Sequence, residues 1–370
     1  MLILSFSPLA GDARVLKQIR HFAPLFDVTT CGYGPSPHPD VEHLEIPASA
    51  GVELDGRLIT LRAYRAVHAR VPAVRAARAL LRSRRFDVAI ANDVESVPVV
   101  LGVVPASRVL ADLHEFSPRL HEESAAWMRR ISPYLSWLCR RFVSRAGATT
   151  TVSDGLAREY EKQFGFRPQV VTNAAPFADL EPQVVGSPIR LVHSGAGLRN
   201  RNLMLMLDAV EATTTPVTLD LFLTANDPGY IAELRERAQT LPGVTVHDPV
   251  PYDRLIHVLN DYDTGVHMLP PSSFNNRWAL PNKFFDYVQA RLGLLIGPSP
   301  EMAAYVQRWG VGAVADDFTA DALTARLDDL TPESVRAFKA RSHEAAPVLA
   351  ADTQIAIWAQ TVDRLLEGAR

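Results

Sequence analysis

Two charged residues at the start of a predicted helix have the spacing needed to bind a diphosphate. Pro281 suits the first turn of a helix, and Lys283 and Asp286 follow it three positions apart, on one helix face. Backbone N–H groups at a helix start attract anions, Lys283 would add positive charge, and Asp286 could accept hydrogen bonds from ribose hydroxyls. The chain has only four lysines, so a lysine here is informative. The simpler interpretation is a surface ion pair that stabilises little.

A second candidate anion site is the loop that follows a predicted strand at residues 189–193. Residues 194–202 contain two glycines together with Arg199 and Arg201, and they lead into an apolar helix. Free backbone N–H groups at the helix start, with two arginines beside them, would form an anion-binding loop. A flexible, solvated loop is the alternative interpretation.

The sequence motifs of several common active sites are absent. The chain has no GxxxxGK[ST] phosphate loop and no GxSxG nucleophile motif. The pair His114-Glu115 resembles the start of an HExxH zinc motif, but Pro118 stands where the second histidine would be. The two cysteines, Cys31 and Cys139, do not form a CxxC pair. We therefore expect no metal site and no bound cofactor.

The elements that must position these residues alternate between short apolar strands and amphipathic helices. Nearly continuous apolar strands separated by helices indicate parallel sheets covered on both faces, so we predict an α/β fold with two doubly wound domains. The predicted strands lie at residues 2–6, 28–31, 87–91, 109–113, 149–152, 170–172, 189–193, 217–223, 244–247, 265–269, 294–296 and 311–315.

Domain boundaries follow from composition. Residues 174–188 hold three prolines and a glycine, as expected of a linker, so we place the boundary near residue 185. This predicts an N-terminal domain of residues 1–185, a C-terminal domain of residues 186–350 and a final helical segment of residues 351–370. That last helix is predicted from apolar residues at helical spacing, which are Ile355, Trp358, Val362 and Leu365.

Composition and charge narrow the classes of protein. The 370 residues include 38 basic and 41 acidic ones, a net charge of −3, which excludes the overall positive field of a nucleic-acid binder. The N-terminus lacks the basic region of a signal peptide. The longest stretch without strongly polar residues, residues 97–106, is far shorter than the ~20 residues of a membrane span. We expect a cytoplasmic protein.

Arginine is unevenly distributed. Residues 57–85 contain nine arginines and no acidic residue, and residues 124–153 contain five arginines among aromatic side chains, again without an acid. Basic amphipathic helices of this kind lie on anionic membranes, which predicts contact with the inner face of the cell membrane. A solvated arginine face is the alternative interpretation.

The order of these motifs resembles that of the GT-B glycosyltransferases, specifically the bacterial nucleotide-sugar-dependent enzymes of glycosyltransferase family 4. The resemblance covers nearly the whole chain. Its last segment, from Leu280 to Tyr287, is similar to the family's Pro-x-Lys-x-x-Glu-Tyr donor motif. The other segments that carry it are residues 12–14, 112–115, 151–153, 171–173 and 195–202.

The resemblance implies two facing Rossmann-like domains with the active site in the cleft, and a C-terminal helix that crosses back to the N-terminal, acceptor-binding domain. It implies metal-independent transfer of a hexose from a UDP or GDP sugar, with retention of configuration, to a saccharide or lipid-linked acceptor of envelope or extracellular polysaccharide. The residues implied to be catalytic are His114, Lys283 and Arg201. The residues implied to bind the donor, in the C-terminal domain, are Arg199, Arg201, Pro281, Asn282, Lys283 and Asp286. Those implied on the acceptor side are Gly11, Asp12 and Glu115.

One departure keeps two alternatives open. Many family members have two glutamates separated by seven residues, and here Asp286 takes the second place while Trp278 takes the first. A non-catalytic GT-B-like subunit that binds a nucleotide or a partner glycosyltransferase is therefore one alternative. A nucleotide-sugar epimerase is the other, although no further acid–base pair is recognisable.

Overall fold

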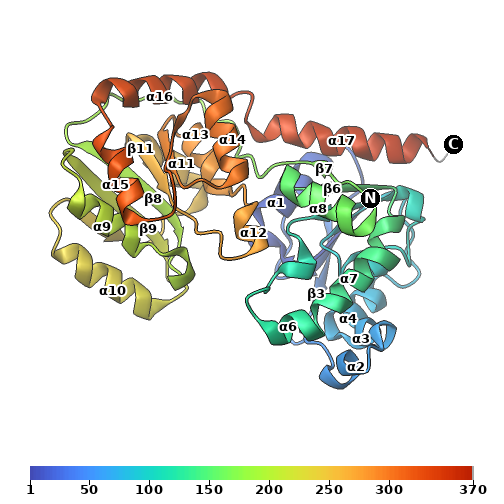
Figure 1. Cartoon of the computed structure of the whole chain (residues 1–370). Coiled ribbons are helices and arrows are strands. Elements are labelled where there is room, and N and C mark those ends of the chain that lie inside the picture. The colour runs from blue at the N-terminus through green and yellow to red at the C-terminus, as the bar shows by residue number, and fades with distance from the viewer. Residues whose placement is uncertain (369–370) are drawn as a thin grey trace. The chain divides into compact units, whose positions relative to one another are not determined.

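The computed structural model describes residues 1–368, and it divides into two compact units (Figure 1). Unit 1 contains Met1–Thr172, Ser273–Asn275 and the chain from Gln354 onward. Unit 2 contains Asn173–Ser272 and Asn276–Thr353. Each unit has its own parallel sheet with helices, so the predicted α/β fold with two Rossmann-like domains is confirmed.

Unit 1 is built on a seven-stranded sheet in the order β3-β2-β1-β4-β5-β6-β7, and all its strand pairs are parallel. The central strands are buried on both faces, which explains their continuous apolar sequences. The strands are β1 (Leu2–Pro8), β2 (Thr29–Tyr33), β3 (Glu42–Ile46), β4 (Ala89–Asn92), β5 (Val109–Leu113), β6 (Ala148–Thr151) and β7 (Gln169–Val170).

The helices of unit 1 begin at residues suited to helix starts. Asp12 caps the first of them, since its carboxylate accepts the N–H groups of Arg14 and Val15. The α-helices are α1 (Ala13–Phe22), α2 (Gly56–Thr60), α3 (Tyr64–Arg70), α4 (Pro72–Leu80), α5 (Val97–Val100), α6 (Ala125–Arg130), α7 (Ser132–Arg141) and α8 (Asp154–Phe164). Short 3₁₀ helices are η1 (Leu9–Gly11), η2 (Ala106–Arg108), η3 (Ser117–Arg119) and η4 (Val143–Arg145).

The last helix, α17 (Ala351–Glu367), packs on unit 1. Trp358, Val362 and Leu365 are buried in one apolar cluster with Ile3 and Val15. Their helical spacing in the sequence therefore reflects burial against the sheet and α1.

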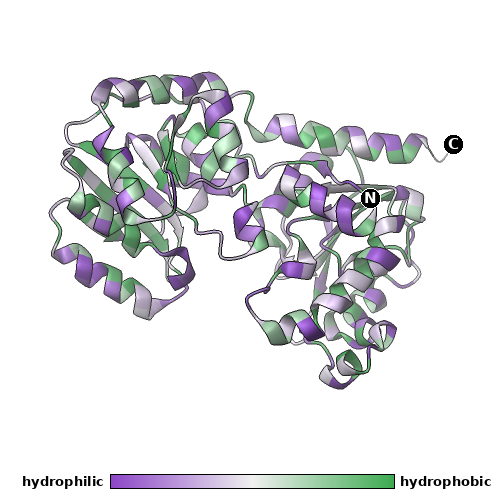
Figure 2. Ribbon diagram, viewed as in Figure 1, coloured by the Kyte–Doolittle hydropathy of each residue, from purple (hydrophilic) through white to green (hydrophobic). Residues whose placement is uncertain are grey.

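Unit 2 is built on a six-stranded parallel sheet in the order β10-β9-β8-β11-β12-β13. Figure 2 shows mostly apolar residues on the strands of this sheet, whereas its helices carry both hydrophilic and apolar residues. The strands are β8 (Ile189–Ala196), β9 (Val217–Thr224), β10 (Val244–His247), β11 (Thr264–His267), β12 (Gly293–Ile296) and β13 (Gly312–Val314). The helices are η5 (Arg199–Arg201), α9 (Met204–Ala212), α10 (Pro228–Gln239), α11 (Tyr252–Asn260), α13 (Asn282–Gln289), α14 (Pro300–Trp309), α15 (Ala320–Asp328) and α16 (Pro332–Ala345).

The observed division corrects the predicted boundary near residue 185. The proline-containing segment after Thr172 packs on unit 2: Ala174 and Ala175 lie in its core, and the N–H of Gly186 donates to Asp263 at 3.1 Å. Buried alanines and this hydrogen bond fix the segment, so its prolines do not mark a free linker.

A short segment of the C-terminal half belongs to unit 1. Phe274, at the start of α12 (Phe274–Arg277), lies 5.4 Å from the ring of Phe116, and the guanidinium of Arg119 stands 4.5 Å above the Phe274 ring. The side chain of Asn275 accepts the N–H of Phe116 at 2.8 Å and donates to its carbonyl oxygen at 3.4 Å. Aromatic packing and a two-way backbone contact thus hold this segment in unit 1.

Within residues 1–368, no helix has both the length and the apolar character that a bilayer span needs.

Candidate active site

Each sheet changes strand order at one place, and ligands of open α/β sheets bind at the carboxyl ends of strands at such a point. In unit 1 the change lies between β1 and β4, and in unit 2 between β8 and β11. Polar side chains gather at both places.

The unit 1 cluster is organised by Asp112, which is fully buried at the end of β5. Arg14 of α1 donates to it twice, from Nε at 2.8 Å and Nη2 at 2.7 Å. Gln18 Nε2 and Thr150 Oγ1 donate at 2.7 and 2.6 Å. Burial raises the pKa of Asp112, but Arg14 and His114 outweigh it and hold this pKa well below its usual range. Asp112 is therefore a permanent anion.

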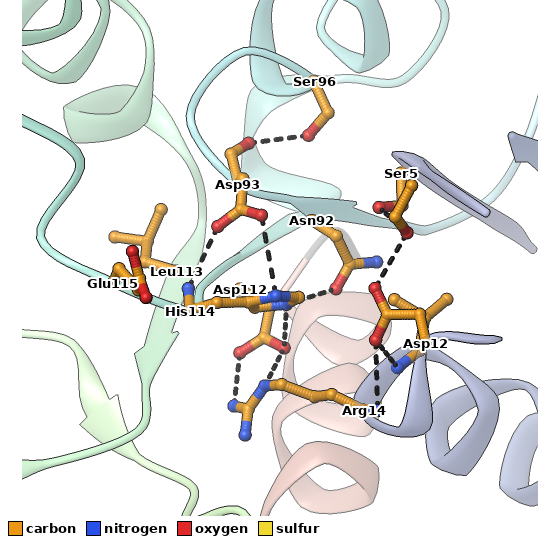
Figure 3. Close-up of polar contacts among 12 residues, drawn as sticks. Ser5, Asp12, Arg14, Asn92, Asp93, Ser96, Asp112, Leu113, His114 and Glu115 are labelled. Atoms are coloured by element: carbon orange, nitrogen blue, oxygen red, sulfur yellow. Dashed lines mark hydrogen bonds and ion pairs between the residues drawn. The ribbon is translucent and has the colours of Figure 1, made fainter. Parts of the chain in front are cut away.

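His114, predicted as a catalytic residue, lies beside this anion and is partly exposed (Figure 3). Its Nε2 is 3.2 Å from Asn92 Oδ1 and 3.5 Å from Asp112 Oδ2, and its Nδ1 is 3.5 Å from Asp93 Oδ2. Burial lowers the pKa of His114, but Asp93 and Asp112 outweigh it and raise the pKa to about 9. At neutral pH, His114 is therefore an imidazolium that can donate hydrogen bonds.

Asn92 and Asp93 were missed in the sequence. Asn92 ends β4 and exchanges hydrogen bonds with Gln18, while its Oδ1 also faces His114. Asp93 has a left-handed backbone with φ of 62°, which is strained for a residue other than glycine. Its carboxylate accepts the N–H of His114 at 3.1 Å. A polar pair directly after a predicted apolar strand is the signal that could have found them.

The three residues predicted on the acceptor side are near this cluster but differ in surroundings. Asp12 caps α1 and accepts a hydrogen bond from Ser7 at 2.8 Å, so its carboxylate has a structural use. Gly11 is exposed, and a Cβ there would meet open space. Glu115 is exposed, and its carbonyl oxygen accepts the Tyr160 hydroxyl at 2.7 Å.

The unit 2 cluster brings Lys283 close enough to Arg201 for their charges to interact. Lys283 is in the first turn of α13, and its amine lies over Gly195 in β8, where a Cβ would collide with Nζ. Arg201 ends η5 and donates to Asn276 at 3.3 Å. Burial, and next the positive charge of Arg201, lower the pKa of Lys283 to about 7. Two basic side chains thus share a half-buried position that favours an anionic ligand.

Arg199, also predicted to bind the donor, is engaged elsewhere. Its two terminal nitrogens donate to Glu233 at 2.8 and 2.7 Å, and its guanidinium lies 4.9 Å from the ring of Tyr230. The hydrogen bond to Glu233 raises the pKa of Arg199. Of the two arginines in this loop, Arg201 is therefore the one placed beside Lys283.

The loop itself differs from the predicted anion cradle. The N–H groups of Gly197, Arg201 and Asn202 donate to carbonyl oxygens within the unit, and that of Met204 donates to the Tyr230 hydroxyl. These donors are already used. Positive side chains, rather than these N–H groups, must supply most of the attraction for an anion here.

The remaining predicted donor residues lie on α13. Pro281 is the N-cap with extended backbone, and Asn282 is exposed in the first turn without a side-chain cap. Asp286 is buried, and the Tyr252 hydroxyl lies 3.5 Å from its Oδ1. The helix α13 thus carries the Lys283 amine and the exposed Asn282 in its first turn, and the buried Asp286 carboxylate one turn further along.

Among residues 1–368, no three His, Cys, Asp or Glu side chains lie together so that they could hold a metal ion.

Comparison with known proteins shows what the chain is similar to. Residues 13–181 match the model of Glycosyltransferase Family 4. The resemblance seen in the sequence is thereby confirmed: the chain is similar to GT-B glycosyltransferases of this kind. A search of curated protein sequences found no match.

Solved structures of glycosyltransferases share the fold over nearly the whole chain. Sucrose-phosphate synthase from Thermosynechococcus elongatus has a TM-score of 0.73 at 12% identity, covering 100% of this chain and 99% of that one. A glycosyltransferase from Rickettsia africae has a TM-score of 0.70 at 10% identity, covering 99% and 98%. HepE from Anabaena, solved with UDP and glucose, has a TM-score of 0.69 at 13% identity, covering 98% of each chain. At these identities the likeness establishes the fold.

Proposed function

We propose that the protein is a glycosyltransferase that moves a hexose from a nucleoside-diphosphate sugar to a saccharide or lipid-linked acceptor in envelope or extracellular polysaccharide synthesis. The observation that carries this proposal is the pairing of Lys283 with Arg201 at the carboxyl end of β8, together with Asp286 one turn further along α13. Two basic side chains suit a diphosphate, and a buried carboxylate suits ribose hydroxyls. The family match and the UDP complex of HepE support this donor class.

The proposed mechanism needs no metal. A departing diphosphate gains negative charge, and Lys283 and Arg201 would stabilise it in place of a cation such as Mg²⁺. Unit 2 would bind the donor, and unit 1 would bind the acceptor. His114, as an imidazolium, would donate a hydrogen bond to a hydroxyl of the transferred sugar. We further propose retention of the anomeric configuration.

A membrane-facing role is proposed for unit 1, because its two arginine-rich stretches meet. Arg130 of α6 donates to the carbonyl oxygen of Gly56 in α2 at 3.0 Å, and the rings of Tyr64 and Trp137 are 5.8 Å apart. Leu61 is 75% exposed beside them. The arginine surface consists of exposed side chains, namely Arg57, Arg62, Arg65, Arg70, Arg75, Arg78, Arg82, Arg85, Arg129, Arg130, Arg140, Arg141 and Arg145. We propose that this surface contacts anionic lipid at the inner face of the cell membrane.

A non-catalytic, nucleotide-binding subunit is the second candidate. It is favoured by Trp278, which occupies the place of the first acidic residue in the donor motif and packs 5.6 Å from Arg277. Such a subunit would bind the nucleotide without turning over the sugar.

Thermal stabilisation by UDP, GDP, ADP, CMP and NAD tests donor binding. A ligand at 100 times its Kd stabilises the folded protein by about 2.7 kcal/mol. Stabilisation by one nucleoside diphosphate, followed by transfer from its sugar conjugates, would support the enzyme. Stabilisation without transfer or hydrolysis would support the subunit, and a flat response to all five compounds would contradict both.

A further inference from the structure

Two buried histidines stand behind Lys283, and the proposed donor chemistry does not use them. His193 lies in β8 and His267 ends β11, and both are buried. Their ring centroids are 5.8 Å apart and the rings are inclined by 25°. Neither ring nitrogen of His267 has a hydrogen-bond partner among the described residues. Buried imidazoles at a strand end need a physical explanation.

The hydrogen bonds of His193 fix its tautomer. Its Nδ1 is 2.8 Å from the carbonyl oxygen of Val266, which can only accept. Nδ1 therefore carries the proton, and Nε2 presents a lone pair. That lone pair lies 3.4 Å from Nζ of Lys283. The amine thus has an acceptor on its buried side.

Gly195 leaves the space that the amine occupies. A Cβ on Gly195 would collide with Nζ of Lys283, and the φ of 149° at this residue also favours glycine. Lys283 is therefore held between the backbone of β8 and the His193 ring.

The surroundings of the amine are mostly neutral or positive. The groups that face it are Arg201 from η5, His193 from β8, His267 from β11 and Asp286 from α13. Burial, and next Lys283 itself, hold the pKa of His193 well below its usual range, so this ring stays neutral. Burial and Arg201 bring the pKa of Lys283 to about 7, against the opposing effect of Asp286.

We propose that His193 is a positioning residue that holds the Lys283 amine over Gly195 until the donor diphosphate replaces the imidazole as its partner. The amine then takes up a proton from solvent and bonds to a phosphate oxygen. This inference rests on the proposed donor site. It makes nucleotide binding by this protein a proton-linked event near neutral pH.

Two substitutions test whether His193 positions the Lys283 amine or only fills space in the core. His193→Gln keeps an acceptor near the place of Nε2, whereas His193→Asn keeps a donor near Nδ1 toward Val266 and removes the acceptor. UDP binding is measured by calorimetry between pH 6 and 9, in buffers of different ionisation enthalpy. The diphosphate replaces the hydrogen bond to His193, so His193→Asn acts on the free protein, where it lowers the pKa of Lys283. Proton uptake on UDP binding near neutral pH should therefore be larger in His193→Asn than in the wild type, and in His193→Gln it should stay near the wild-type value. Equal proton uptake in all three proteins would overturn the proposal.

A second measurement needs no ligand. Labelling with acetic anhydride across pH, read by mass spectrometry, reports the reactivity of each of the four lysines, with exposed Lys162 as the internal reference. Removing the acceptor destabilises the ammonium, so the Lys283 profile should shift to lower pH in His193→Asn and stay near that of the wild type in His193→Gln. Identical profiles in all three proteins would overturn the proposal.

Gly195→Ala provides a third variant should either histidine variant fail to fold. Its methyl group would displace the amine, so the Lys283 labelling profile and UDP binding should both change. An unchanged profile would contradict the placement of the amine. If the wild type binds neither UDP nor GDP, the proposed function fails, while the labelling still decides the relationship of His193 to Lys283.

Discussion

Asp93 binds His114 at two points. Its Oδ1 accepts the backbone N–H of His114 at 3.1 Å, and its Oδ2 lies 3.5 Å from Nδ1 of the ring. The left-handed backbone of Asp93, with φ of 62°, costs about 1–3 kcal/mol in a residue of this type. A strained residue thus supplies the charge that keeps His114 protonated.

The charge of His114 predicts how stability depends on pH. Its pKa is about 9 in the folded protein, against 6.5 for a free histidine. Because the pKa of His114 is higher in the folded than in the unfolded protein, its protonation stabilises the folded state. This stabilisation is complete below the pKa of the unfolded protein, and it is lost as the pH rises through about 9. The difference in free energy of unfolding between wild type and His114→Gln should be largest below pH ~6.5, at most on the order of 3 kcal/mol, and should shrink toward pH 9.

Urea denaturation at several pH values measures this difference. Asp93→Asn is the matched variant, because asparagine tolerates the left-handed backbone and still accepts an N–H, but lacks the charge. This substitution should lower the pKa of His114, so that the midpoint of its ring titration in NMR spectra moves to lower pH. A pH-independent difference, or an unchanged titration, would contradict the assignment.

The buried ion pair of Arg14 with Asp112 predicts a large loss of stability when broken. Removing one partner leaves an uncompensated buried charge, so Arg14→Met should destabilise unit 1 by about 3–5 kcal/mol. Arg84 also bonds a carboxylate twice, that of Glu42, at 2.6 and 2.8 Å, but this pair is exposed. Arg84→Met should therefore cost no more than about 1 kcal/mol. Chemical denaturation measures the free energy of unfolding of both variants. Similar losses of stability would show that burial does not add to the cost of breaking the Arg14–Asp112 pair.

The donor site predicts a contrast between two neighbouring arginines. Lys283→Ala and Arg201→Ala should each lower turnover at least about tenfold, through lost stabilisation of the departing diphosphate. Arg199→Ala should have a much smaller effect, because the Arg199 guanidinium is held by Glu233. Steady-state kinetics with the nucleotide sugar found by binding would test this. Wild-type turnover in Lys283→Ala would remove the role of this residue.

The arginine surface predicts binding to anionic vesicles. Phosphatidylglycerol vesicles at low salt should carry the protein upward in flotation, and neutral vesicles should not. Each arginine near the surface contributes about 1 kcal/mol, so the double variant Arg62→Glu/Arg65→Glu should lower the bound fraction strongly. Exchange of the exposed Arg308 and Arg336 of unit 2 for glutamate is the control. Equal loss in both pairs would indicate a general charge effect.

The sequence predicted most of the parallel sheets but missed one strand. The bounds of β5 and β10 were predicted as observed, because charged or turn-forming residues flank each apolar run: Arg108 and His114 flank β5, and Gly243 and Asp248 flank β10. The missed strand is β3, which lies at the edge of its sheet and has only two apolar residues, Leu44 and Ile46, among its five. Charges at an edge strand hide the apolar pattern on which the prediction relied.

The site residues were predicted from their spacing within short segments of sequence. The partners of a side chain could not be predicted where they come from distant segments. Lys283 was predicted from its position in a helix start. The pairing of Arg199 with Glu233 joins residues 34 positions apart, and no pattern in either segment indicates it. The left-handed backbone of Asp93 is likewise set by the surrounding fold, since aspartate adopts this conformation only where its surroundings favour it.

The three residues Ser273–Asn275 make unit 1 a domain that no continuous stretch of sequence encodes. A polypeptide ending at Thr172 would keep all seven strands of its sheet but lose Phe274 from the Phe116 ring and the whole of α17 from the core. Such a fragment would expose the apolar positions that Trp358, Val362 and Leu365 cover. Unit 1 can therefore complete its folding only after the ribosome has passed residue 354, when unit 2 has already been synthesised.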